Sequence, residues 1–92
     1  MKTPKGQSRE AAEMLAVQAL AFIAADQTRL AGFLNTTGLS PAAIRTAAKQ
    51  PGFLAGVLEH MLADESLLIA FAEAAGIDPA AIARARAAFG GT

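Results

Sequence analysis

Apolar side chains recur along this chain with the three- and four-residue spacing of an α-helix. The clearest stripe consists of Leu54, Val57, Leu58, Met61 and Leu62. These positions are i, i+3, i+4, i+7 and i+8, so they share one face of a helix. Residues that favour strands are sparse, and Ala, the best helix former, is the commonest residue. The pattern therefore predicts an all-α chain.

Capping residues divide the chain into six expected helices, which span roughly residues 8–25, 26–38, 40–49, 51–63, 64–76 and 78–89. The N-cap residues are Ser8, Asp26, Ser40, Asp64 and Asp78. Their side-chain oxygens can accept hydrogen bonds from the free N–H groups of a first helical turn. Gly38 and Gly76 are expected to end helices in the left-handed conformation, and Gly90–Gly91 to end the fold.

The chain also contains an internal repeat. Residues 25–44 and 63–82 align without a gap at an offset of 38, with nine identities in twenty, and the similarity extends to units of about 14–50 and 52–88. The shared positions are caps, helix ends and core residues. One three-helix unit buries little surface, so we expect the two units to pack about an approximate two-fold axis. The prediction is a compact, pseudo-symmetric six-helix bundle in a single domain of residues 8–92, after a flexible tail of residues 1–7.

Composition indicates how the core is built. Apolar residues make up 53% of the chain, but 24 of them are Ala. A core with so few large side chains depends on close contacts between helices. The 92 residues suffice for one domain and leave no room for a second.

The N-terminal region resembles a signal peptide, because Lys2, Lys5 and Arg9 precede an apolar stretch. Glu10, Glu13 and Gln18 interrupt that pattern, and the stretch aligns with an internal helix of the repeat. We therefore interpret it as the first helix of the fold. No apolar run reaches membrane-spanning length, and the chain has no cysteine, which fits a cytoplasmic protein.

Catalytic residues are not evident. His60 and Asp64 are four positions apart on one helix face, as a proton-transfer pair or two metal ligands would be. In the repeat they take the places of Phe22 and the cap Asp26, and a metal site needs a third ligand. We therefore expect a non-enzymatic protein without catalytic, cofactor-binding or metal-binding residues, and keep a site centred on His60 and Asp64 as the weakest hypothesis.

The isolated Gly32, Gly52 and Gly56 are expected at close helix crossings.

Four basic residues offer a nucleic-acid hypothesis: Arg45, Lys49, Arg84 and Arg86. The segment from Thr37 to Lys49 superficially resembles a helix-turn-helix. Eight basic and eight acidic residues cancel, however, so the chain lacks the strong positive charge that nucleic-acid binding needs. A nucleic-acid-associated regulator is thus the alternative to an interaction module.

Positions that differ between the repeats are more informative about function than those that agree. Arg29 becomes Leu67, and Ala31 becomes Ile69. Together with Leu68, these residues make the helix of 64–76 apolar around most of its circumference, and the helix of 8–25 has the same character. A helix apolar on all sides is either central or covers a partner. We therefore expect Leu67, Leu68 and Ile69 to form an interaction surface for a homodimer or for another protein.

Several segments resemble a known family: residues 15–26, 37–41, 53–79 and 80–90, of which LADESLL is the most specific part. The chain resembles a family of short alphaproteobacterial proteins known only as a domain of unknown function. The resemblance covers nearly all of the chain after the N-terminal tail. It implies a small, all-helical, cytosolic bacterial protein, and it implies no activity, substrate or cofactor.

Overall fold

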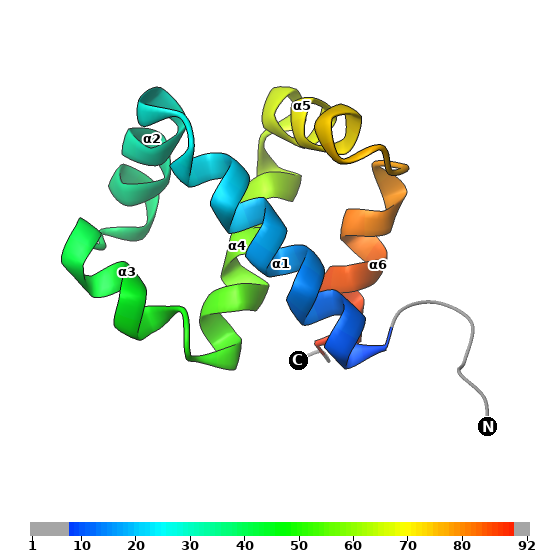
Figure 1. Ribbon diagram of the computed structural model, residues 1–92, viewed down its shortest axis with the longest axis horizontal. Coiled ribbons are helices and arrows are strands. Elements are labelled where there is room, and N and C mark those ends of the chain that lie inside the picture. The colour runs from blue at the N-terminus through cyan, green and yellow to red at the C-terminus, as the bar shows by residue number, and fades with distance from the viewer. Residues whose placement is uncertain (1–7, 90–92) are drawn as a thin grey trace.

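The computed structural model describes residues 8–89, and the predicted tail of residues 1–7 and the predicted end at Gly90–Gly91 lie outside this range. The described residues form six helices and no strand, which confirms the all-α prediction (Figure 1). The helices are α1 (Arg9–Ala24), α2 (Gln27–Thr37), α3 (Pro41–Ala47), α4 (Pro51–Ala63), α5 (Glu65–Ala75) and α6 (Ala80–Ala88).

Polar caps begin α1, α2, α3 and α5 at the predicted places, whereas Pro79 and not the predicted Asp78 is the N-cap of α6. The Asp26 Oδ1 atom accepts hydrogen bonds from the backbone N–H groups of Thr28 (2.9 Å) and Arg29 (3.1 Å). Asp64 does the same for the N–H of Leu67 at 3.2 Å. Since α2 and α5 start and stop 38 positions apart, the repeated sequence produces repeated local structure.

Glycines in the left-handed conformation end α2 and α5, as predicted. Gly38 has φ of 76° and Gly76 has φ of 70°, and these are the only described residues with positive φ. The backbone N–H of Gly38 donates to the carbonyl of Leu34 at 2.8 Å. A side chain at either position would strain the backbone, so these two glycines set the lengths of their helices.

Three helices form the centre of the molecule: α1, α4 and α6 pack against one another, while α2 packs on α1 and α5 packs on α4. Helix α1 crosses in front of α4 in Figure 1. The core cluster comprises Ala12, Leu15, Ala16, Ala19, Ile23, Phe33, Leu54, Val57, Leu58, Met61, Leu67, Phe71, Ile82 and Ala85. Among residues 8–89 no polar or charged side chain is buried, so apolar contacts hold the centre together.

The two repeat units differ in how their third helices pack. Ala81, Ile82 and Ala85 of α6 are buried against α1 and α4. The corresponding residues of α3 are only partly covered, and α3 packs on no other helix as extensively as α6 does. Local structure therefore repeats, but the predicted two-fold arrangement of equal units is not confirmed.

The explanation predicted for the isolated glycines is wrong. A Cβ atom placed on Gly32, Gly52 or Gly56 would meet no other atom within 4 Å. No neighbouring helix therefore packs closely on these glycines, and close helix packing does not explain them. Gly32 in particular lies in the middle of α2 on an exposed surface.

Within residues 8–89, no single helix combines the length and the apolar character needed to cross a membrane. Helices α5 and α6 pass that test only as a pair, and the pair is bent by 96°.

Two Gly→Ala substitutions should change stability in opposite directions. Gly76→Ala should lower the free energy of unfolding by about 1 kcal/mol, because alanine resists the left-handed conformation. Gly32→Ala should raise it by up to about 1 kcal/mol, because alanine is a better helix former and the new methyl group meets no atom. Urea denaturation monitored by circular dichroism measures both changes. Equal loss of stability in the two variants would contradict the assigned backbone conformations.

Candidate functional site

The predicted surface of Leu67, Leu68 and Ile69 is divided by the fold. Leu67 is 7% exposed and belongs to the core, and Leu68 is half-buried. Ile69 is 38% exposed. Helix α5 packs on α4 and so directs Leu67 inward. The prediction is therefore wrong for Leu67, and the three residues do not form one continuous surface.

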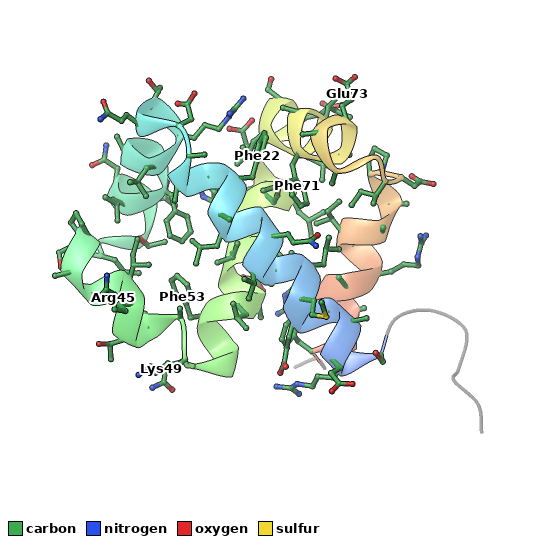
Figure 2. The ribbon with its side chains drawn as sticks, viewed as in Figure 1. Phe22, Arg45, Lys49, Phe53, Phe71 and Glu73 are labelled. Carbon is green, nitrogen blue, oxygen red and sulfur yellow. The ribbon has the colours of Figure 1, made fainter. Side chains whose placement is uncertain are left out.

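The four basic residues lie in two separate places. Arg45 on α3 and Lys49, just after α3, are exposed at one end of the molecule (Figure 2). Arg84 and Arg86 lie on α6, on the opposite side in Figure 1. The Arg86 Nε atom donates to Glu59 Oε2 at 2.6 Å. The structure thus does not bring the predicted basic residues together on one face.

The most exposed large apolar side chains of the described residues lie on the outer side of α1. Met14 is 64% exposed and Val17 is 53% exposed. The other exposed residues from position 11 to the end of this helix are Ala11, Gln18, Ala21 and Ala24. Gln18 is thus the only polar residue among them. The opposite side of α1 packs on α4 and α6. Helix α1 is therefore central in the fold but exposed to solvent on its outer side.

Three shallow hollows border this face of α1, and Gln18 lines all of them. The first reaches Leu54 of α4, the second reaches Ile77 and also Ala81 of α6, and the third reaches Ala74 and Ala75 of α5. In the third hollow the rings of Phe22 and Phe71 lie 5.4 Å apart at 56° (Figure 2). We name the exposed side of α1 from Ala11 to Ala24, with these hollows, the α1 face.

Charge is distributed unevenly to either side of the α1 face. Residues 27–58, which include α2 and α3, contain three Lys or Arg and no Asp or Glu. Residues 59–83, which include α5, contain five Asp or Glu and no Lys or Arg. Arg45 and Lys49 mark the basic end of the molecule in Figure 2, and Glu73 marks the acidic end. The side of α1 that holds α2 and α3 is therefore net positive, and the side that holds α5 is net negative even though Arg84 and Arg86 of α6 lie on it.

A second site lies between α2, α4 and the start of α5. This polar groove is lined by Thr28, Arg29, Gly32, Thr36, His60, Asp64, Ser66 and Leu67. The fold thus brings His60 and Asp64 to one groove, as their spacing predicted. Among residues 8–89, no group of three or more His, Cys, Asp or Glu side chains could hold a metal ion.

Aromatic rings fix two side chains of the polar groove. The His60 ring meets the Phe33 ring edge-to-face, with centroids 5.1 Å apart. The Arg29 guanidinium lies over the Phe22 ring, 4.4 Å from its centroid, and 3.7 Å from Asp26 Oδ2. Stacking of this kind restrains an arginine without removing its charge.

The sequence pattern did not single out the α1 face, because apolar residues surround the whole helix. Ala12, Ala16 and Ala19 are fully buried, whereas the larger Met14 and Val17 are exposed. Size and hydrophobicity alone would have predicted that Met14 and Val17 are buried and that the three alanines are exposed. Gln18 was the available signal, because a polar residue in an apolar stretch indicates the side that faces away from the core.

Comparison with known proteins identifies one family. The family described as "Protein of unknown function (DUF3572)" matches residues 9–92. Neither a curated protein nor a solved structure matches the chain.

Substitutions at Leu67 and Ile69 should separate core from surface on α5. Leu67→Arg should lower the free energy of unfolding by about 3 kcal/mol, because it places a charge at a buried position. Ile69→Arg should change it by less than about 1 kcal/mol, because that side chain is already partly in water. Thermal or urea denaturation checks both values. Similar small effects at the two positions would show that Leu67 is not part of the core.

Proposed function

We propose that this chain, which belongs to the family of proteins of unknown function DUF3572, is a small non-enzymatic interaction module that pairs with a second copy of itself. The observation that carries the proposal is the α1 face, where Met14 and Val17 are more than half exposed. Large exposed apolar areas are typical of sites where proteins associate. Covering one such side chain contributes about 1.5–3 kcal/mol when burial is complete.

Gln18 favours a second copy over an unrelated partner. It lies at the meeting point of the three hollows, with Met14 and Ala21 on either side of it along α1. A two-fold axis through Gln18 would place it against its own counterpart. Because the amide of glutamine both donates and accepts hydrogen bonds, two such side chains satisfy each other. One polar pair within an apolar helix interface also sets the register of the helices.

The charged ends support the same arrangement. A two-fold axis that runs parallel to α1 within the interface makes the two α1 helices parallel. Since α2 and α3 lie on one side of α1 and α5 on the other (Figure 1), the basic end of each copy then lies over the acidic end of its partner. Opposite charges brought together steer association and disfavour the antiparallel arrangement, in which like charges would meet. This is an isologous dimer, in which both copies use the same surface.

The proposal includes two features of the chain that the sequence suggested. The equal lengths of α2 and α5, and the matching caps at Asp26 and Asp64, support an origin from two pseudo-symmetric three-helix units. The lack of cysteine supports a cytoplasmic location, where disulfides are rare.

Substitution within the α1 face should dissociate the dimer. Val17→Glu should raise the dimer dissociation constant at least tenfold, because it brings two carboxylates into an apolar interface. Analytical ultracentrifugation across a dilution series measures the constant. Ile69→Glu is the matched control: it places the same charge at another exposed apolar position, and association should be unchanged. A wild-type chain that stays monomeric at every concentration would rule out self-association.

Salt should weaken the dimer. Raising the ionic strength from about 0.01 M to about 0.15 M shortens the Debye length from about 30 Å to about 8 Å. If the basic and acidic ends face each other, the dissociation constant should rise several-fold over this range and level off at higher salt. Charge reversal at Arg45 and Lys49 should abolish this dependence. A dimer that is insensitive to salt would retain the apolar contact but refute the parallel arrangement.

A further inference from the structure

The polar groove gathers residues that the fold itself does not need. Four of its lining positions differ from their counterparts 38 residues away: Arg29 corresponds to Leu67, Gly32 to Ala70, Thr36 to Ala74, and His60 to Phe22. In three pairs the residue in the groove is more polar or smaller than a counterpart outside it, and in the fourth pair both Arg29 and Leu67 line the groove. Helices α2 and α5 have the same length with either set, so the polar set is not required to build the helix.

Gly32 has no structural explanation in its own helix. Glycine in a helix interior is less stable than alanine by about 1 kcal/mol, and an added Cβ would meet nothing within 4 Å. Nothing in the packing therefore requires glycine at this position. Thr28 and Thr36 lie one turn of α2 to either side of Gly32. Because Gly32 has no side chain, the base of the groove between these two threonines stays open.

Two opposite charges line the groove from different helices. Arg29 comes from α2, and Asp64 precedes α5. The described ion pairs are Arg9–Glu13, Arg29–Asp26 and Arg86–Glu59, so Arg29 and Asp64 are not paired with each other. Asp64 uses one carboxylate oxygen, Oδ1, to cap α5. The groove thus presents a cation and an anion on separate walls.

Asp64 would repel a purely anionic ligand and Arg29 a purely cationic one, and Asp26, 3.7 Å from the Arg29 guanidinium, offsets part of the Arg29 charge. A molecule that carries both charges is attracted by both. From this geometry we infer that the groove binds a small zwitterion of the α-amino-acid class, with its carboxylate on Arg29 and its ammonium group on Asp64. The hydroxyl groups of Thr28, Thr36 and Ser66 surround the ligand as additional hydrogen-bond partners.

The test is a titration of the ¹⁵N-labelled full chain, followed by amide chemical shifts, with each neutral proteinogenic amino acid in turn. At least one should produce saturable shifts at Gly32, Thr36 and Ser66. Its N-acetyl derivative lacks the ammonium charge and its amide lacks the carboxylate, and each should bind at least tenfold more weakly. Equal binding of either derivative would overturn the zwitterion assignment, and absence of saturable shifts with every amino acid would overturn the site.

Variants connect the binding to the named residues. Arg29→Leu installs the residue of the second repeat and should abolish saturable binding, as should Gly32→Leu, which fills the base of the groove. Arg84→Leu removes an arginine outside the groove and should bind like the wild type. Gly32→Ala is expected to be more stable than the wild type, so weakened binding in that variant could not be ascribed to unfolding. Val17→Glu should bind normally, which separates this inference from dimerisation.

Discussion

The packing of α1 against α4 and α6 is the contact on which the rest of this fold depends. Helix α1 meets these neighbours through Ala12, Ala16 and Ala19, all fully buried. Small side chains allow helix axes to approach closely, so the larger Val57, Leu58 and Ile82 fill the remaining space. The outer helices α2 and α5 then attach to α1 and α4. A larger residue at one of these alanines would separate the three central helices.

The same contact explains why an apolar surface remains exposed. A central helix can be covered on all sides only when enough other helices surround it. Here α2, α4 and α6 occupy part of the circumference of α1, and α3 packs closely on none of the others. Small chains have a high ratio of surface to volume, so the outer side of α1 stays in water with Met14 and Val17 on it. A second copy would complete the coverage of α1.

Some predictions for the site residues were correct and others were wrong, and each result has a structural reason. His60 and Asp64 were predicted to share a helix face, and they do line one groove, because a four-residue spacing sets that relation. Leu67 was expected on a surface, but its helix turns it toward the core. Arg45 and Arg84 were grouped as basic residues of two predicted helices, yet α3 and α6 lie on opposite sides (Figure 1). Gly32 was assigned to close packing, and the space around it is open.

The sequence by itself determined the helices and their ends, including the caps Asp26 and Asp64 and the left-handed Gly38 and Gly76. These features depend on contacts within a few residues, so their signals are local. Only the tertiary structure decided which side of each helix is buried and that α6 but not α3 joins the centre. It also decided that Arg29 of α2 and Asp64, which precedes α5, line one groove. Those outcomes depend on how apolar surfaces distant in sequence compete for the same small core. Because alanine is abundant along the whole chain, the local sequence gives few signals about which apolar surfaces will be buried in the core.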